Sequence, residues 1–372
     1  MGAGVMKKNK FLVFAIVLII FLIWLVYMES YTQGQWYIID FNEDKVSDIG
    51  YEDYEGPIEI EGKYYFIFTR KNRFGEHNPF YKEKYFIVDK EGKTIFEANA
   101  KELTVDVLKN LIMYKNQYIF IDSKGEIVYK MPEDMELVNA TGCFGIMPFY
   151  YKDDSINEDE RRYGYVDIHG NVIVEPKFKK AGAFVEEGLA LVVTEDDKYG
   201  FIDKNGDFII QPIYDFAHDF SDGLADVTLG EKKEYIDIQG RVVLEMDEAE
   251  AVGSFSEGYA PICNNDEKWA HMDKNGNLIT DYIYDSPYYF KNGYADVCVD
   301  GVYGFINTKG EVVIEPQFEF VCSFEDNGFA AAEGDSNLWG FINTNGEWQI
   351  EPKYENMGIV IDDVVVVKEQ KK

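Results

Sequence analysis

The sequence predicts an all-β fold of tandem antiparallel β-meander repeats that close into a β-propeller-like ring. Three observations support this prediction. A short motif recurs at a nearly fixed spacing, each copy contains β-rich runs separated by turn residues, and no copy is large enough to bury its own apolar face. A closed ring is favoured over an open β-solenoid because closure protects the edges of the sheets.

The motif is clearest at Tyr199–Pro212, which reads YGFIDKNGDFIIQP. With Gly200 as the anchor, the frame recurs every 34 or 36 residues, at the anchors Gly164, Gly200, Glu234, Ala270, Gly304 and Gly340. The residue before the anchor is aromatic in five of these six copies. Glycine stands six places after every anchor, at Gly170, Gly206, Gly240, Gly276, Gly310 and Gly346. Proline stands twelve places after four of them, at Pro176, Pro212, Pro316 and Pro352. A fixed period of this length is typical of repeat architectures.

Each copy begins with two predicted strands, as at Tyr199–Asp203 and Asp207–Gln211, with Pro212 ending the second. The residues between them predict a tight turn in which Gly206 takes a positive φ. The residue three places after the anchor is Asp or Asn in every copy, at Asp167, Asp203, Asp237, Asp273, Asn307 and Asn343. A row of calcium ligands is the functional alternative. The Lys-Asn-Gly that follows Asp203 lacks the converging oxygens of a calcium loop, so an Asx-turn is the better interpretation.

A Gly-x-Ala pair opens a further strand, predicted at Leu224–Leu229, and a short strand is expected near Tyr214–Phe220. One set of aromatic residues keeps a constant phase, at Phe184, Phe220, Phe255, Phe290 and Phe324. An aromatic ladder that stacks sugars or bases is one interpretation of this set. We favour a core between neighbouring units, because a single repeat cannot bury its own apolar face.

The pattern Tyr/Trp-Gly-Phe-Ile-Asp-x-x-Gly, followed by Ile-x-Pro-x-Tyr, resembles the WG-repeat (KWG-type) family of bacterial proteins over Tyr163–Glu355. The literal Trp-Gly pair occurs at Trp339-Gly340, and Tyr replaces Trp in three other copies. The resemblance implies a repeat scaffold without a general activity. No catalytic, ligand-binding or metal-binding residue is therefore assigned from it.

Residues 36–162 contain degenerate copies, and residues 163–367 contain the regular ones, which together make about eight units of 33–36 residues. Two degenerate copies, Tyr85–Gly92 and Tyr118–Gly125, keep the spacing from Asp to Gly. The other predicted features are a first strand at Trp36–Asp40, interruptions at Phe74–Phe80 and Ala98–Asn110 (the latter as a short helix), a polar hairpin loop at Tyr150–Arg162, an edge or closure strand at Ile359–Val367, and a frayed tail at 368–372.

The N-terminal segment predicts a single-pass membrane anchor. Lys7, Lys8 and Lys10 precede eighteen uninterrupted apolar residues, Phe11–Met28. A helix of this length spans roughly 27 Å, close to the thickness of a hydrocarbon core. No small-x-small cleavage site follows, which argues against a signal peptide. The positive-inside rule then makes residues 1–10 cytoplasmic, 11–28 the anchor, 29–35 a tether, and the repeats extracytoplasmic.

The charge and the motif content exclude several functions. The chain has 36 basic and 68 acidic residues, a net charge of −32, which excludes generic binding to nucleic acid. The four histidines lack metal-ligand spacing, and no phosphate-binding or nucleophile motif is present. We therefore expect no cofactor, no metal and no enzyme activity. Cys263 and Cys298 occupy equivalent positions in neighbouring units, and we expect free thiols there.

These observations favour a membrane-anchored, extracytoplasmic, non-catalytic binding or adaptor module for cell-envelope or secreted proteins, with cationic partners preferred. A purely structural envelope scaffold and a carboxylate-dependent cell-wall glycosidase are the alternatives. Specificity is expected where the copies depart from the repeat. Those places are the insertion Lys152–Arg162, the degenerate units before Tyr118, and the substitution Trp269-Ala270-His271.

Overall fold

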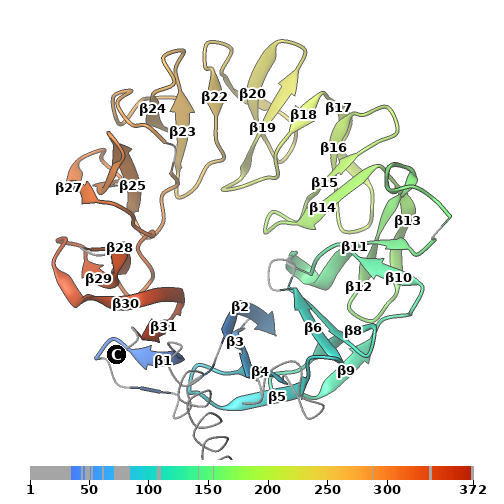
Figure 1. The fold of residues 1–372 in the computed structure, drawn as a ribbon. Helices are drawn as coiled ribbons and strands as arrows, with labels where there is room; N and C mark the ends of the chain where they lie inside the picture. Colours follow the sequence, from blue (N-terminus) through green and yellow to red (C-terminus); the bar gives the residue numbers. More distant parts are fainter. Residues whose placement is uncertain are drawn as a thin grey trace, which may run out of the picture.

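The computed structural model describes residues 35–369, except 43–44, 47–50, 52, 61–62, 71–83, 107–109, 141, 154, 287 and 335–336. These residues form eight antiparallel β-sheets that follow one another in chain order around a ring (Figure 1). The ring confirms the predicted all-β, propeller-like architecture over an open solenoid. The predicted anchor Phe11–Met28 and the interruption Phe74–Phe80 lie outside the described residues. Within the described part of the chain, no helix is both long and apolar enough to span a membrane.

Five of the eight sheets contain four strands, and each strand pairs with its neighbours in sequence. Sheet 1 contains β2 (Asp53–Ile60), β3 (Lys63–Arg70), β4 (Lys84–Val88) and β5 (Thr94–Asn99). Sheet 2 contains β6 (Leu103–Asp106), β7 (Leu111–Tyr114), β8 (Gln117–Ile121) and β9 (Ile127–Lys130). Sheet 3 contains β10 (Met135–Leu137), β11 (Ile146–Tyr151), β12 (Tyr163–Asp167) and β13 (Val172–Phe178). Sheet 4 contains β14 (Lys180–Phe184), β15 (Ala190–Val193), β16 (Tyr199–Ile202) and β17 (Phe208–Tyr214). Sheet 5 contains β18 (Phe216–Ala217), β19 (Leu224–Leu229), β20 (Lys232–Asp237) and β21 (Val242–Glu245).

The remaining three sheets depart from four strands. Sheet 6 contains β22 (Ala251–Val252), β23 (Tyr259–Cys263) and β24 (Trp269–Asp273). Sheet 7 contains β25 (Tyr294–Val299), β26 (Val302–Asn307) and β27 (Val312–Phe318). Sheet 8 contains β28 (Phe329–Glu333), β29 (Trp339–Asn343), β30 (Trp348–Ile361), β31 (Val364–Glu369) and β1 (Trp36–Asp40). Two short 3₁₀ turns, η1 (Cys143–Gly145) and η2 (Glu158–Glu160), lie in the loops flanking β11.

The short helix predicted within Ala98–Asn110 is wrong, because this stretch contains the end of β5 and all of β6. Leu103 is buried and Val105 packs against the same core, which lies between sheets 1 and 2. Apolar residues that alternate with polar ones in this way satisfy the period of a strand rather than that of a helix.

The ring closes by pairing the two ends of the described chain. β1 and β31 are antiparallel, with Trp36 opposite Lys368 and Asp40 opposite Val364. The fourteen-residue β30 pairs with β29 through its first half and with β31 through its second. β1 itself reads WYIID, in the place of the YGFID of Tyr199–Asp203. A ninth repeat unit is therefore assembled from both ends and fused to sheet 8 through β30. The predicted strand at Trp36–Asp40 is confirmed. The predicted closure strand Ile359–Val367 is the end of β30 and the start of β31, separated by a turn at Asp362. The tail predicted to fray from residue 368 is wrong for Lys368 and Glu369, because both lie in β31 and pair with β30.

The anchor glycine is explained by a close contact with the outer strand. Between the pairs Tyr199–Tyr214 and Phe201–Ile210, β17 has two more residues than β16, so it bulges toward Gly200. A Cβ atom on Gly200 would lie 2.8 Å from Cα of Pro212. Pro212 therefore lies in a bulge inside β17 and does not end the strand, as the sequence had suggested. The two copies whose anchors are Glu234 and Ala270 also lack the proline.

The predicted turn chemistry is confirmed. Gly206 has a φ of 86°, and its five equivalents have values between 76° and 80°. Asp203 Oδ1 accepts hydrogen bonds from the backbone N–H groups of Asn205 (2.9 Å) and Asp207 (3.0 Å). Asp273 is the equivalent residue two copies later. It accepts hydrogen bonds from Asn277 and Asn275, which lower its pKa to about 2. These carboxylates are engaged by their own turns, which supports the Asx-turn interpretation over a calcium site.

The phased aromatic residues form the core between sheets, as predicted. Phe201 in sheet 4 packs on Phe220 with ring centroids 4.7 Å apart, and Phe305 packs on Phe324 at 4.6 Å. All four side chains are almost completely buried. Each sheet thus covers an apolar face of its neighbour.

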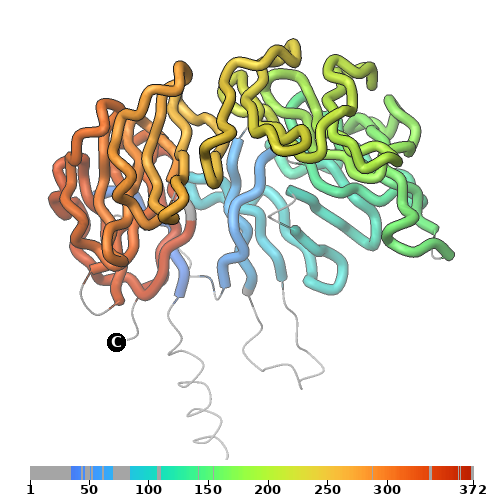
Figure 2. Tube along the Cα trace, turned by 90° about the horizontal axis from the view of Figure 1, so that it is seen from above, coloured from blue at the N-terminus to red at the C-terminus, as the bar shows by residue number. Residues whose placement is uncertain are grey.

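The two faces of the ring carry different loops, because neighbouring strands run in opposite directions. One face, here called the turn face, carries the Asp-to-Gly turns and the Gly-x-Ala turns. The other, here called the insertion face, carries the loops between the second and third strands of each unit, including Lys152–Arg162. β1 begins and β31 ends on the insertion face, and the N–H of Glu369 donates to the carbonyl of Gln35 at 3.2 Å (Figure 2).

We predict that Gly206→Val destabilises the fold by about 1–3 kcal/mol or more, since the variant combines an unfavourable φ with a clash. A Cβ atom on Gly206 would lie 2.4 Å from Cγ2 of Val174 in sheet 3. Gly223→Val is the matched control, because Gly223 has a φ of 81° and nothing within 4 Å of such a Cβ. Urea unfolding should show a larger loss for Gly206→Val than for Gly223→Val. Equal losses would mean that contact between sheets does not constrain this turn.

Candidate functional site

The described residues of the insertion Lys152–Arg162, which are 152–153 and 155–162, form a loop between β11 and β12. Asn157 and Glu160 make a reciprocal capping box across η2. Arg162 pairs with both carboxylate oxygens of Glu195 in sheet 4, through Nε and Nη2. Lys152 pairs with Glu136 at 3.2 Å. The loop is therefore held by ion pairs at both ends.

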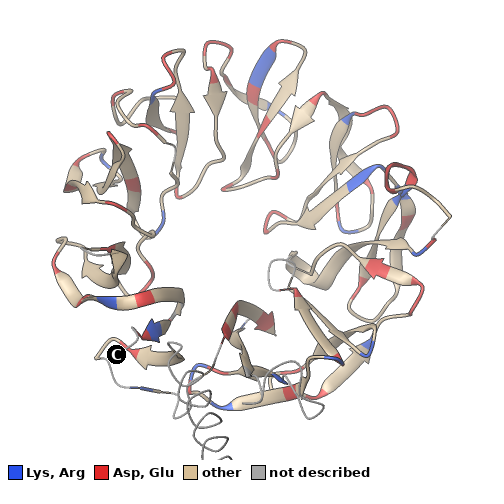
Figure 3. Ribbon diagram, viewed as in Figure 1, with Lys and Arg blue, Asp and Glu red and all other residues tan. Residues whose placement is uncertain are grey.

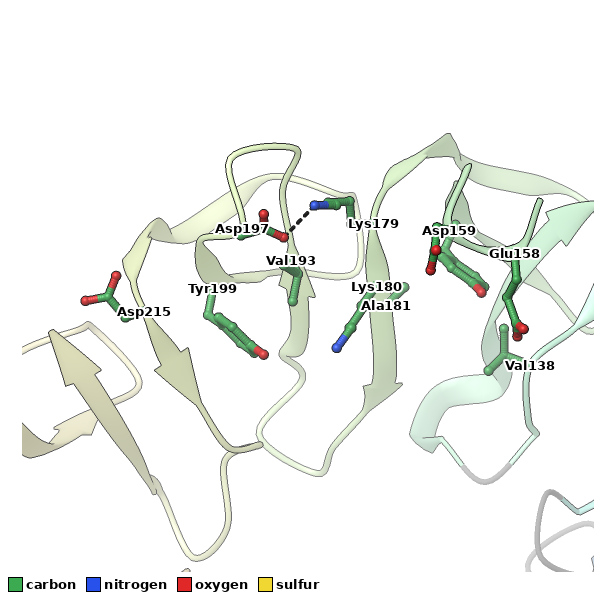
Figure 4. A pocket seen from close by; sticks show the side chains of 11 residues that line it. Val138, Glu158, Asp159, Lys179, Lys180, Ala181, Val193, Asp197, Tyr199 and Asp215 are labelled. Atoms are coloured by element: carbon green, nitrogen blue, oxygen red, sulfur yellow. Dashed lines mark hydrogen bonds and ion pairs between the residues drawn. The ribbon is translucent and has the colours of Figure 1, made fainter. Parts of the chain in front are cut away.

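The loop borders a hollow of about 680 Å³ on the insertion face, between sheets 3 and 4. Glu158 and Asp159 stand on one side, and Tyr199 and Asp215 stand on the other (Figure 4). Lys179, which also lines the hollow, pairs with Asp197 at 2.5 Å, and Asp215 pairs with Lys198. The exposed carboxylates of Glu158 and Asp159 have no such partner across the hollow among its described lining residues. The site is therefore a shallow, charged surface and not an enclosed pocket.

The substitution at Trp269-Ala270-His271 has a structural explanation. His271 is buried, and its Nε2 hydrogen bonds to the carbonyl oxygen of Tyr288 at 2.8 Å. The equivalent residues Tyr165 and Tyr235 reach the next sheet in the same way, with hydroxyl groups donating to the carbonyls of Gly182 (2.9 Å) and Gly253 (2.6 Å). His271 thus replaces a tyrosine hydroxyl in the core. The expectation that this substitution creates specificity is not supported by its position.

Sequence reasoning missed a set of hydrogen bonds that join the Gly-x-Ala turns of neighbouring sheets. The residue before the glycine, here called the bridging residue, accepts a hydrogen bond from the next sheet. Glu187 accepts from the N–H of Gly223 (2.8 Å), Asp222 from Gly258 (2.5 Å) and Glu257 from Gly293 (2.8 Å). Their acidic side chains follow one another at 35-residue spacing, which is the signal that could have revealed them.

A lysine in the Asp-to-Gly turn of the next unit adds an ion pair to some bridging residues. Lys274 pairs with Asp222 at 2.8 Å. Lys90 in sheet 1 pairs with Asp362, which follows β30, at 2.8 Å. The second pair crosses the point where the ring closes. The bridging carboxylates are therefore structural.

The described residues contain no group of three or more His, Cys, Asp or Glu side chains arranged to hold a metal ion. Two buried aspartates stand at equivalent places in strands β19 and β25. Asp226 contacts the ring nitrogen Nδ1 of His218 at 2.6 Å, and Asp296 accepts a hydrogen bond from Ser323 at 3.2 Å. Burial raises the pKa of Asp296 to about 6. Cys263 and Cys298 are buried free thiols.

Acidic side chains occur in every part of the ring (Figure 3). Many of them take part in Asx-turns or bridging contacts, as described above for Asp203 and Asp222. The exposed remainder gives the surface its acidic character, in line with the net charge of −32.

We predict that His271→Tyr retains the fold and removes part of its acid sensitivity. Burial lowers the pKa of His271 below its usual 6.5, so the unfolded chain binds a proton that the folded chain excludes. The stability that this group contributes is full above pH 6.5 and is lost as the pH falls below it. Urea unfolding above and below that pH should therefore show a smaller acid loss for His271→Tyr than for the wild type.

Asp296 acts in the opposite direction, because its raised pKa adds stability as the pH falls through about 6. The contribution of His271 is therefore read from the difference in acid loss between the variant and the wild type. His169→Gln, which removes an exposed turn histidine, is the control and should follow the wild type. An unchanged acid loss in His271→Tyr would contradict the role of His271.

No curated protein matches the chain. Among solved structures, similarity is found to the computationally designed Ika8 protein (12% identity, TM-score 0.42, covering 73% of this chain and 93% of that one). BamB from Moraxella catarrhalis is similar at 11% identity and a TM-score of 0.39, covering 91% and 97%. A eukaryotic initiation factor is similar at 12% identity and a TM-score of 0.42, covering 88% and 83%.

The family model for the WG containing repeat matches six segments, at residues 163–199, 199–232, 235–269, 272–303, 303–333 and 339–372. These segments span more than half of the chain. The chain therefore belongs to the WG-repeat family.

Proposed function

We propose that this protein is a membrane-anchored, extracytoplasmic and non-catalytic binding module for protein partners of the cell envelope. The main support is that the recurring polar residues of the repeat are already engaged inside the ring, in Asx-turns and bridging contacts. A scaffold of this kind carries recognition in the segments that depart from its repeat. The insertion Lys152–Arg162 is such a departure and carries exposed carboxylates, and we assign it the main contact.

The membrane anchor rests on the sequence of Phe11–Met28. Ser30–Gln35 would connect this anchor to β1, a distance of at most about 20 Å for six extended residues. Since β1 begins on the insertion face, this connection would turn the insertion face toward the membrane and the turn face away from it. A partner bound at the insertion would then lie close to the membrane surface.

The chemistry of the loop favours a cationic partner. Its basic residues are paired internally, Lys152 with Glu136 and Arg162 with Glu195, while Arg161 lies 3.6 Å from Glu158. The Glu158 side chain is 82% exposed, and Asp159 is exposed beside it. Contacts between opposite charges at an exposed surface speed association and weaken with added salt.

We predict that mass spectrometry of the mature protein finds the segment Phe11–Met28 still attached, because no small-x-small cleavage site of a signal peptide follows it. Protease treatment of intact cells should degrade the repeats and spare the segment before Phe11. A mature N-terminus near Ser30 would show instead that the segment is a removed signal peptide.

We predict that the double variant Glu158→Gln, Asp159→Asn reduces capture of partners from envelope fractions by roughly three- to tenfold at low salt. Both side chains are exposed, so the fold should retain its melting temperature. Glu315→Gln, Glu319→Gln is the matched control, since it removes the same charge from exposed positions in and after β27. Equal capture by both variants would contradict the assignment of the loop, and turnover of a substrate by the purified protein would contradict a non-catalytic function.

A further inference from the structure

One bridging residue is not polar. Phe144 stands in sheet 3 at the position that Glu187, Asp222 and Glu257 occupy in the next three sheets. Ile146, two residues later, pairs with Asp167, as Leu224 pairs with Asp237. A carboxylate at this position would accept a hydrogen bond from the Gly-x-Ala turn of sheet 4. Phe144 places an aromatic ring there instead.

Phe144 has a positive φ, as the bridging residues Asp222, Glu257 and Asn292 do, although that conformation suits its side chain poorly. Its φ is 68° and its ψ is 9°. The other non-glycine residues with positive φ in the described chain are Asn, Asp, Glu or Lys. A bulky apolar residue in this region is a genuine outlier, and such outliers cluster at functional sites.

The ring of Phe144 is also exposed where a core residue would be buried. Its side chain is 51% exposed, beside Ile168 at 38% and Val128 at 62%. Nζ of Lys204, in the Asp-to-Gly turn of sheet 4, lies 3.3 Å from the centroid of the Phe144 ring. This contact replaces the ion pair that Lys274 makes with Asp222. Phe144 thus contributes neither to the core nor to the bridging hydrogen bonds.

Phe144 borders an apolar groove of about 390 Å³ between sheets 2 and 3 on the turn face. The groove is lined by Ile112, Val128, Cys143, Phe144 and Ile168, with Glu59 at its rim. Glu186 and Glu187, in the Gly-x-Ala turn of sheet 4, lie close to Cys143. Burial raises the pKa of the Cys143 thiol, and the negative charges of Glu186, Glu59 and Glu187 raise it further. Glu59 thus lies at the rim of the apolar groove, and two further carboxylates lie near Cys143, one of its lining residues.

We propose that this groove binds an apolar side chain from a basic segment of a partner protein, an inference that rests on the proposed binding function. The exposed Phe144, Val128 and Ile168 supply the apolar contact, and Glu59, Glu186 and Glu187 supply charge complementarity for flanking Lys or Arg. The unfavourable backbone of Phe144 is retained because its ring is needed at the surface. A polar bridging residue would fit the backbone better but would leave the groove without its exposed aromatic wall.

The test uses the full chain in nanodiscs of neutral phosphatidylcholine, with empty nanodiscs as the blank. The probes are two fluorescein-labelled synthetic peptides that share Phe and Leu residues, one alternating them with Lys and the other with Glu. Fluorescence anisotropy should show binding of the Lys peptide, weaker at high salt, and little binding of the Glu peptide. Bound Lys peptide should also slow modification of the half-buried Cys143 by N-ethylmaleimide and leave Cys322 unaffected.

Phe144→Asn is the decisive variant. Asn is the bridging residue at position 292, where it adopts a φ of 53°, so this variant should retain or raise the melting temperature. Affinity for the Lys peptide should fall roughly tenfold or more, as for loss of an aromatic contact at the centre of an interface. Ile209→Asn, which removes a 47% exposed side chain of sheet 4, is the control and should bind as the wild type does.

Several outcomes would overturn the proposal: unchanged affinity in Phe144→Asn, equal binding of both peptides, or no protection of Cys143. If any of these occurs while the Glu158, Asp159 variant still loses its partners, the groove is not a binding site and the proposed function stands. If partner capture survives both the loop variant and Phe144→Asn, neither surface is the binding site, and only a wild-type chain that captures no partner at all would contradict the binding function itself.

Discussion

Closure of the ring is the constraint on which the rest of the structure depends. Each sheet covers an apolar face of the next, so the first and last units would expose theirs unless they met. β1 supplies the third strand of the last unit, and Trp36, Ile38, Val364 and Val366 form one core with Phe66 and Phe68 of sheet 1. Lys90 and Asp362 pair across the same junction. Because closure uses both ends of the described chain, the ends lie together on one face.

Within a unit, the contact between the anchor glycine and the proline bulge fixes how the outer strand lies. Gly164, Gly200, Gly304 and Gly340 each face a proline twelve residues later, at a distance that leaves no room for a Cβ atom. Where Ala270 replaces the glycine, the proline is absent and the outer strand is reduced to two isolated bridges, Met272–Leu278 and Trp269–Tyr284. The anchor glycine and the proline of the motif are therefore coupled by direct contact. Where the proline bulge is absent, the anchor position has room for a side chain.

The sequence was most informative where local chemistry decides the structure. Gly206 and Asp203 specify a turn through residues at most four positions apart, so their roles followed from spacing alone. The phase of Phe220 and its equivalents likewise predicted burial between units. The sharing of β30 between two units and the bridging contact of Glu187 with Gly223 were not predicted, because they join residues that only the closed ring brings together. The helix expected in Ala98–Asn110 was wrong for a related reason. Packing against sheet 1 decides that this segment is a strand.

The departures from the repeat show why a candidate site cannot be identified from unusual residues alone. His271 and Phe144 are equally unusual in the sequence, yet one restores a hydrogen bond inside the core and the other removes one and exposes an aromatic ring. What distinguishes them is the contact that each replaces and the direction in which each side chain points. The insertion loop and the Phe144 groove, moreover, lie on opposite faces of the ring. Two surfaces so placed cannot converge on one small molecule, which is why we propose a contact with another macromolecule for each.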